Sequence, residues 1–460
     1  MMDNVEGRGN VLWMNSEGKG QAKMMNRGRH REPVRALNMC ALLSAFVCAF
    51  ILFAALPAST HSTDLHQFTG ASTDLPQFTL QIYGNANEDD TVDMRDVTYI
   101  KLVIFGKKPE TEFSDANYDG RVSMLDVVQT KLIIVGKEAK LTIVDSADRI
   151  VTVKKPVERI VIGTPSWMYD AVWIIGAQDE VVGVTKEAKE RFAKMLPGIQ
   201  DKQSIGSYRD PDFEVILSLE PDIVFGERRY VEGLKDTGIP VITMKFREIE
   251  KVDSEFRILA KILGKEERVE SFIGWKNGYI DQLKEKTKEI ESKVRVYAEW
   301  SDVPLCTGSR GSGVHDVIEL AGGYNIANDL HGPYPQVSPE WVLDKNPEVI
   351  IFPAFADFAP TDLTGYHINS HENAKQFIEE ARNRIELNGT DAVKNNRVYV
   401  LDGHYTESAV KNFIGAFYCA KWFYPELFKD LKPEEIHREY FEEWLGVPYK
   451  GIWAYPLIGG

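Results

Sequence analysis

The chain has 460 residues, and 43% of them are hydrophobic, which is enough apolar material for more than one folded core. Its formal net charge of -15 argues against a nucleic-acid partner, because phosphate binding needs clustered Lys and Arg on the folded surface. We therefore expect two or three domains and no binding to nucleic acid.

A basic N-terminal segment, residues 1–35, precedes an uncharged apolar run, ALNMCALLSAFVCAFILFAALP. The length of the run favours a transmembrane anchor at 36–58 over a cleaved signal peptide, whose apolar core is about 7–15 residues. Cleavage after Ala58 is the alternative, since small residues follow the run. In both cases the preceding positive charges direct the remaining chain out of the cytoplasm. Residues 59–80 repeat a Ser- and Thr-rich phrase, STDLHQFT then STDLPQFT, and predict a linker.

Residues 81–139 contain two similar segments, NANEDDTVDMRDVTYIKLVIFG and DANYDGRVSMLDVVQTKLIIVG, and each predicts a polar loop followed by one helix. Each loop follows the EF-hand spacing of Ca²⁺ ligands at positions 1, 3, 5, 7, 9 and 12, with a backbone carbonyl at position 7. Gly120 stands at the sharp turn of the second loop, whereas the first has Asp90, so we expect weaker binding by the first loop. The predicted ligands are Asn85, Asn87, Asp89, Thr91, Asp93 and Asp96 in the first loop and Asp115, Asn117, Asp119, Arg121, Ser123 and Asp126 in the second.

This segment resembles a type I dockerin, whose two calcium loops also end in Asp at position 12. The resemblance covers residues 85–137 and implies a small all-helical, EF-hand-like module that folds with Ca²⁺. It also implies docking to a cohesin-like domain on another surface protein. A purely structural stalk near the membrane is the alternative.

From residue 140 onward, predicted strands and helices alternate, which is typical of parallel α/β sheets. The strands RIVIG, EVVGVT, PDIVFG and PVITM, with a helix at 170–176, predict a first lobe at 140–252, and a further helix is predicted at 253–263. A long charged segment with an apolar stripe predicts a linking helix within 253–293. The strands RVYAEW, PEVIIFP and RVYVLDG, followed by a helical tail at 408–445, predict a second lobe at 294–460.

One phrase occurs in both lobes, as DFEVILSLEPDIVFG and SPEWVLDKNPEVIIFP. Asp212 and Ser338 each predict an N-cap, a proline ends the short helix, and a strand follows. Glu214 and Glu340 therefore occupy the first turns of equivalent helices. Each acid would complement the helix dipole by about 0.3–1 kcal/mol, which is the purely structural interpretation. The matched placement in both lobes favours a functional one.

Residues 140–460 resemble a class III solute-binding protein of ABC transporters, of the iron-chelate, haem and cobalamin group. The resemblance rests on the order of GTPSWMYDAVWIIGAQDEVVGVT, GSYRDPDFEVILSLEPDIVFG, the long helix and QVSPEWVLDKNPEVIIF. It implies two lobes that hold a metal chelate or tetrapyrrole and deliver it to an ABC permease. It also implies that Glu214 and Glu340 engage permease arginines. A cell-surface assembly protein that docks through the dockerin-like module is the competing hypothesis.

Ligand contacts are expected from loops at strand ends, because clefts in open α/β sheets form there. Aromatic rings cover large planar ligands, and Arg pairs with their carboxylates. The candidates that follow from these rules are Thr164, Ser166, Trp167, Tyr208 and Arg209 in the first lobe and Trp300, Arg310, Tyr334, Phe355, His404 and Tyr405 in the second. Among them, the chemistry favours Arg209, Arg310, Trp167 and Tyr405.

The sequence does not predict an enzyme. No motif places a catalytic His and carboxylate together, and His404 with Glu227 is the one candidate pair. A bare metal ion as cargo is disfavoured, because metal-ion-binding relatives carry a histidine where this chain has Thr164 to Trp167. Cys306 and Cys419 are the cysteines beyond the apolar run, and both a disulfide and two buried thiols are compatible with the sequence.

Overall fold

The computed structural model describes residues 78–164, 166–355 and 362–457. The predicted basic segment and the 36–58 anchor lie outside these residues, as does nearly all of the 59–80 linker. Within the described part of the chain, no helix combines the length and the apolar character needed to cross a membrane.

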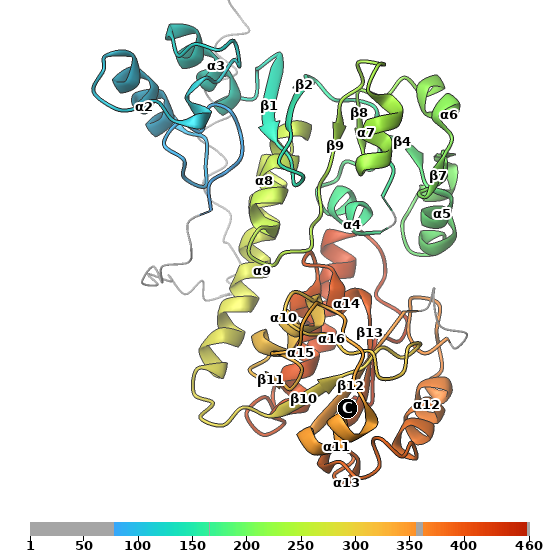
Figure 1. The fold of residues 1–460 in the computed structure, drawn as a ribbon. Helices are drawn as coiled ribbons and strands as arrows, with labels where there is room; N and C mark the ends of the chain where they lie inside the picture. The colour runs from blue at the N-terminus through green and yellow to red at the C-terminus, as the bar shows by residue number, and fades with distance from the viewer. Residues whose placement is uncertain (1–77, 165, 356–361, 458–460) are drawn as a thin grey trace, which may run out of the picture. The chain divides into compact units, whose positions relative to one another are not determined.

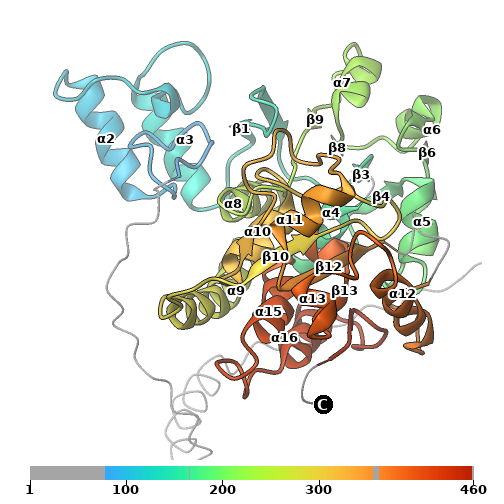
Figure 2. The same ribbon diagram turned by 60° about the horizontal axis from the view of Figure 1, so that its bottom comes forward.

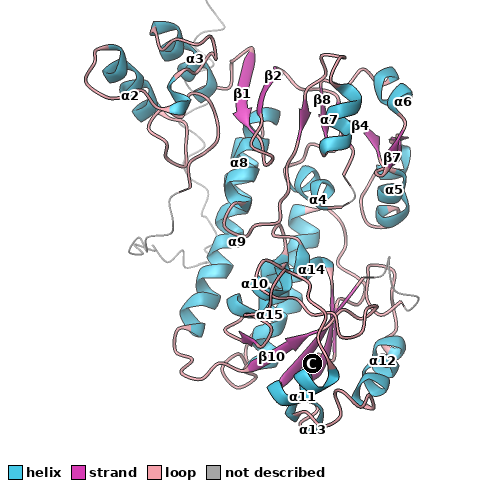
Figure 3. Cartoon of the chain, in the orientation of Figure 1, coloured by secondary structure: helices cyan, strands magenta, loops and turns pink. Residues whose placement is uncertain are grey.

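The segment that contains the two predicted calcium loops consists of helices and loops (Figure 3). Helices α2 (Met94–Ile104) and α3 (Met124–Ile134) each follow one loop, with a 3₁₀ turn, η1 (Glu112–Ser114), between them. Each helix begins with a capping box, Asp93 with Asp96 and Ser123 with Asp126, because a side chain at each end of the box accepts a backbone N–H. A small core of Ala86, Val97, Ile100 and Val127 joins the helices.

An antiparallel hairpin, β1 (Lys140–Val144) with β2 (Ile150–Lys154), precedes the α/β region. This hairpin is not among the elements predicted from the sequence. Residue Ile82 forms an isolated bridge with Ile143, so the hairpin also contacts the start of the calcium-loop segment.

The first lobe is built on a five-stranded sheet in the order β5-β4-β3-β8-β9, and every adjacent pair is parallel. Its strands are β3 (Ile160–Ile162), β4 (Val181–Val184), β5 (Gln203–Ser204), β8 (Ile223–Phe225) and β9 (Val241–Ile242). Its helices are α4 (Trp167–Ile174), α5 (Lys186–Phe192), α6 (Phe213–Ser218) and α7 (Arg228–Leu234), with a 3₁₀ turn η2 (Ile199–Asp201) and a two-residue hairpin, β6 (Gly206–Ser207) and β7 (Asp210–Pro211).

The second lobe has a five-stranded sheet in the order β11-β10-β12-β13-β14, parallel except for β14. The strands are β10 (Arg295–Ala298), β11 (Tyr324–Asn325), β12 (Val349–Ala354), β13 (Val398–Asp402) and β14 (Ala454–Tyr455). The helices are α10 (Gly313–Leu320), α11 (Pro339–Lys345), α12 (Glu372–Arg382), α13 (Asp391–Lys394), α14 (His404–Glu407), α15 (Asn412–Phe423) and α16 (Pro433–Glu439), followed by a π-helical turn η3 (Tyr440–Trp444). The two sheets confirm the predicted parallel α/β fold.

Alternating strand residues bury the two faces of each sheet in different clusters. In β12, Ile351 faces a large core that includes α15 and α16, whereas Ile350 and Phe352 face a smaller core with α12. Figure 2 shows α12 and the α15–α16 pair on different sides of these strands. The large core also contains Ile160 and Ile162 of β3, so one apolar cluster runs through both lobes.

The predicted helix at 253–263 is α8 (Val252–Leu263), and the long helix predicted within 253–293 is α9 (Glu266–Thr287). The break between them falls at Gly264, which ends α8 with φ of +65°, a left-handed conformation that glycine adopts without strain. Figure 1 shows α8 and α9 running past both sheets. Val269 and Phe272 of α9 pack in the shared core, which holds α9 against both lobes.

Candidate functional site

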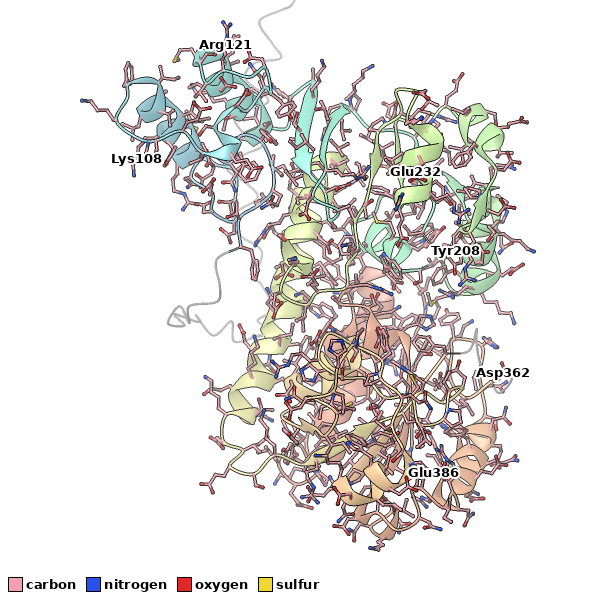
Figure 4. The ribbon with its side chains drawn as sticks, in the orientation of Figure 1. Lys108, Arg121, Tyr208, Glu232, Asp362 and Glu386 are labelled. Atoms are coloured by element: carbon pink, nitrogen blue, oxygen red, sulfur yellow. The ribbon has the colours of Figure 1, made fainter. Side chains whose placement is uncertain are left out.

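A cleft of about 1000 Å³ lies between the two lobes. Much of its wall comes from residues that follow the carboxyl ends of strands β3, β8, β9, β10, β12 and β13, where ligand clefts form in such sheets. Tyr208 of the first lobe and Asp362 of the second lie on facing sides in Figure 4. The lining residues are Ser166, Trp167, Glu187, Glu190, Arg191, Ala193, Lys194, Met195, Tyr208, Glu227, Arg247, Trp300, Asp302, Val303, Tyr334, Phe355, Asp362, Tyr366, His367, His404, Glu407 and Ser408.

Trp167 and Arg247 form the inner wall of the first lobe. Trp167 begins α4 directly after β3, and its indole N–H donates to the carbonyl of Met244 at 3.3 Å. The Arg247 guanidinium lies over the indole, 4.8 Å from the ring centroid, which is within range of a cation–π interaction. The stacking fixes a planar cation beside an aromatic surface in the cleft.

Tyr208 is held at the cleft rim by the first-lobe hairpin. Its backbone N–H donates to Glu187 Oε2 at 3.1 Å, and Arg209 donates from Nε to the Tyr208 hydroxyl at 2.7 Å. Glu187 belongs to α5, so the hairpin and α5 form one face of the cleft. The hydrogen bonds to Ser207 and Tyr208 outweigh burial and lower the pKa of Glu187.

The second lobe contributes an aromatic group built around Phe355. Its ring centroid lies 5.7 Å from Trp300 and 5.2 Å from His404. A Cβ at Gly403 would lie 2.5 Å from the Phe355 ring, so only glycine permits this packing. Asp402 Oδ1 lies 3.0 Å from His404 Nδ1 and orients the imidazole. The result is an apolar surface with one oriented imidazole at its edge.

Glu407 and Tyr334 form a polar pair at the lobe junction. Tyr334 donates its hydroxyl proton to Glu407 at 2.7 Å, and the Val314 N–H donates to the same carboxylate at 3.3 Å. Burial raises the pKa of Glu407 despite these hydrogen bonds and the nearby Arg247 charge. Arg247 thus places its charge close to a carboxylate of the opposite lobe.

The structure brings seven of the eleven predicted ligand residues into the cleft lining: Ser166, Trp167, Tyr208, Trp300, Tyr334, Phe355 and His404. The other four do not line it. Thr164 and Tyr405 are buried, and the Tyr405 ring centroid lies 4.4 Å from the His437 ring centroid in the core. The Arg209 guanidinium lies over the Tyr208 ring, 5.2 Å from its centroid, and the exposed Arg310 donates to the Asn328 side chain at 3.1 Å.

Arg209 and Arg310, the two favoured arginines, therefore do not line the cleft. The cations that line it were not predicted from the sequence. Arg247 follows strand β9, so the strand-end rule contained a signal for it. Arg191 and Lys194 belong to α5 and the segment after it, and no strand-end signal marks them. Nothing in a helical KEAKERF pattern distinguishes a cleft face from a solvated face.

A family model described as periplasmic binding protein matches residues 162–405. The chain belongs to the periplasmic binding protein family. The vitamin B12-binding protein of Salmonella paratyphi A is 29% identical over 198 residues, 41% of this chain and 74% of the relative. The molybdate-binding protein MolA of Haemophilus influenzae is 21% identical over 342 residues, 67% of this chain and 92% of the relative. A TroA-like periplasmic binding protein, FepB from Veillonella parvula, has the same fold, with a TM-score of 0.58 and 23% identity over 69% of this chain and 99% of that one.

These relatives are binding proteins, which is consistent with the absence of a predicted catalytic motif. Glu227 and His404 both line the cleft of this periplasmic binding protein, on opposite lobes. Cys306 and Cys419 are free thiols, and Cys419 is fully buried. His367 also lines the cleft, within a loop that precedes α12, 3.7 Å from Asp362.

The two equivalent glutamates lie where the repeat predicts. Asp212 caps α6 by accepting from Val215 N–H, and Ser338 caps α11 by accepting from Trp341 N–H. Glu214 and Glu340 are the second residues of these helices, and both are exposed. Strands β8 and β12 follow at matching distances. Each lobe therefore presents one solvated carboxylate on an equivalent helix.

The calcium loops carry donor groups that fit a hard cation. Asn85 Oδ1, at position 1 of the first loop, is buried without a hydrogen-bond partner. Asp96 and Asp126, at position 12, are buried carboxylates. Burial raises the pKa of Asp96 and of Asp126 because a buried carboxylate loses its hydration. No group of three or more His, Cys, Asp or Glu side chains positioned for a metal occurs among the described residues.

The two loops differ in their charge partners and backbone. In the first loop, Arg95 pairs with Asp89 at 3.0 Å and with Asp93 at 3.0 Å. In the second loop, Gly120 takes φ of +88°, a conformation that its counterpart Asp90 does not adopt. An arginine paired with these carboxylates would compete with a cation in the first loop, and weaker binding by that loop stays a prediction.

Proposed function

We propose that this chain is the extracytoplasmic solute-binding component of an ABC importer. It captures a metal chelate or tetrapyrrole, such as a ferric siderophore, haem or cobalamin, between its two lobes. The observation that carries the proposal is the cleft of about 1000 Å³ with aromatic walls from both lobes. This volume lies at the upper end of the ~300–1,000 Å³ of typical small-molecule sites. The vitamin B12-binding relatives support the same ligand class.

The charge of the lining argues against a free oxyanion such as molybdate. Three Lys or Arg side chains line the described cleft: Arg191, Lys194 and Arg247. Six carboxylates line it as well: Glu187, Glu190, Glu227, Asp302, Asp362 and Glu407. A small dianion would meet more negative than positive groups, and it would fill little of the volume. A large chelate with groups of both signs suits this surface better.

Delivery to the permease is assigned to Glu214 and Glu340. One exposed carboxylate per lobe, at the same position of equivalent helices, forms a two-point contact whose spacing depends on the separation of the lobes. Charge-assisted pairs with permease arginines would supply orientation as well as affinity. The MolA relative works with an ABC transporter, which supports such a partner.

The second candidate function is cell-surface assembly through the dockerin-like module. Met124, Leu125 and Val128 of α3 are 54%, 63% and 52% exposed, an unusual density of apolar side chains on one short helix. We propose that Ca²⁺ in the two loops orders this helix and that a cohesin-like protein docks on the module. An N-terminal anchor or a cleaved signal at 36–58 would place both functions outside the cytoplasm.

The deciding experiment is a tryptophan fluorescence titration of the full chain in detergent with aquocobalamin, haemin and a ferric siderophore, corrected for inner-filter absorption. Trp167 and Trp300 line the cleft and should be quenched by a bound chelate. The matched controls are Trp167→Phe, which should reduce the quenching, and Trp341→Phe on α11, which should not. Saturable quenching by one probe supports the receptor function. A folded chain that responds to none of them contradicts the proposed ligand class.

A further inference from the structure

A buried ion pair connects the two lobes. Lys411 Nζ lies 2.6 Å from Asp170 Oδ2, and the two side chains are 6% and 3% exposed. Asp170 belongs to α4 of the first lobe, and Lys411 precedes α15 of the second. Both charges have lost their hydration, so each depends on the other.

Both members of the pair are close in sequence to residues that line the cleft. Asp170 is the third residue after Trp167 in α4, and Lys411 is the fourth residue after Glu407, in the segment between α14 and α15. The same segment of the second lobe is tied to the first by a backbone hydrogen bond, from Ala409 N–H to the Phe246 carbonyl at 3.0 Å. Phe246 immediately precedes Arg247 of the cleft wall. A shift at the ion pair would therefore be transmitted to lining residues of both lobes.

Stability alone is a poor explanation for this pair. Two apolar side chains of similar volume are often as stabilising as a buried ion pair, because they avoid the loss of hydration. The surrounding polar groups are also incompletely satisfied: Asp170 Oδ1, Ser408 Oγ, the Asn412 amide and the Tyr440 hydroxyl are buried without a hydrogen-bond partner. Lys411 Nζ lies over the Tyr405 ring, 5.1 Å from its centroid, which restricts the ammonium to one direction. The pair instead supplies a directional contact that forms at one particular distance between the lobes.

We propose that Asp170 and Lys411 are positioning residues that fix the separation of the cleft walls before ligand binds. The role in ligand capture rests on the proposed function, whereas the role in lobe geometry does not. Neither residue lines the cleft, so any effect on ligand must act through the lobe arrangement.

The test compares the distribution of distances between the lobes in the native chain and in a double variant, Asp170→Leu with Lys411→Met, by pulsed electron spin resonance. Spin labels at Glu232→Cys, on the first lobe in Figure 4, and Gln376→Cys, on α12, report the separation. Cys40, Cys48 and Cys306 are replaced by Ser, and Cys419 is fully buried. The full chain is measured in detergent without any ligand, so the result does not depend on the proposed function.

The double variant should keep its Tm within a few degrees while its distance distribution broadens or shifts. The single variants Asp170→Leu and Lys411→Met should each lose about 5 °C or more, because each leaves one buried charge unpaired. An unchanged distribution in a folded double variant overturns the proposal. If the double variant does not fold, Asp170→Asn, which keeps the hydrogen bond and removes the charge, is measured in the same way, and an unchanged distribution there overturns it equally.

Discussion

The Arg247 guanidinium lies over the Trp167 indole, 4.8 Å from the ring centroid, and both side chains line the cleft between the lobes. Arg247 lies in the loop after β9 and Trp167 begins the helix after β3, so the pair exists only because those strands belong to one parallel sheet. It combines an aromatic face with a fixed cation. This combination suits a large chelate that carries anionic groups at its edge.

Replacing Arg247 by Gln should weaken binding of the chelate that quenches Trp167 by about 10-fold, because an ion pair and a cation–π contact are lost. Arg438→Gln is the matched control, since Arg438 also stacks on an aromatic ring, Tyr449 at 5.0 Å, but does not line the cleft. Isothermal titration calorimetry measures both variants. Equal affinities for the two variants would remove Arg247 from the binding site.

Replacing both Glu214 and Glu340 by Ala should abolish uptake of the ligand and leave its affinity for the protein unchanged. Both carboxylates are solvated and neither lines the cleft, so their removal affects docking and not capture. Uptake of labelled ligand is measured in cells that carry the variant as their only copy. The control is Glu232→Ala with Glu380→Ala, which removes one exposed acid from each lobe outside the paired first turns. Normal transport by the double variant at 214 and 340 would contradict the two-point contact.

Asp316 should make stability depend on pH. Burial, then the Glu250 and Glu407 charges, raise the pKa of Asp316 from 3.8 to about 7. The folded state thus binds this proton more tightly than the unfolded chain does. The stabilisation is fully present below pH 3.8 and is lost as the pH rises through about 7.

Relative to Asp316→Asn, the native chain should therefore lose on the order of 2 kcal/mol of unfolding free energy between pH 5 and pH 8. Thermal unfolding at several pH values measures this difference. Asp329→Asn, an exposed acid of the same lobe, should follow the native curve. Parallel pH curves for the native chain and Asp316→Asn would exclude the effect.

The two calcium loops should bind Ca²⁺ with different affinities. Calorimetric titration of the chelator-treated full chain should resolve two binding events. Asp126→Ala should remove the tighter event and Asp96→Ala the weaker one, because Arg95 competes for the carboxylates of the first loop. Asp236→Asn, on the surface of the first lobe, should retain both events. Two equal sites would contradict the proposed difference, and no binding at all would contradict the calcium assignment.

Local patterns predicted the elements more reliably than the contacts. The N-caps Asp212 and Ser338 and the strands after them were predicted correctly, because capping and strand signals depend on neighbouring residues. The helix at 253–263 and the long helix after it were also predicted, whereas the β1–β2 hairpin was missed.

The sequence by itself determined the parallel α/β class, the equivalence of Glu214 and Glu340, and the Ca²⁺-like spacing, since periodicity and capping are encoded within short windows. Only the tertiary structure decided which arginine enters the cleft. Arg209 and Arg310 were plausible by type, but Arg247 occupies the wall, and Tyr405 packs in the core beside the Asp170–Lys411 pair. The direction in which a loop side chain points depends on the strands, helices and opposite lobe that pack around it. Those neighbours are distant in sequence and meet only in the folded chain.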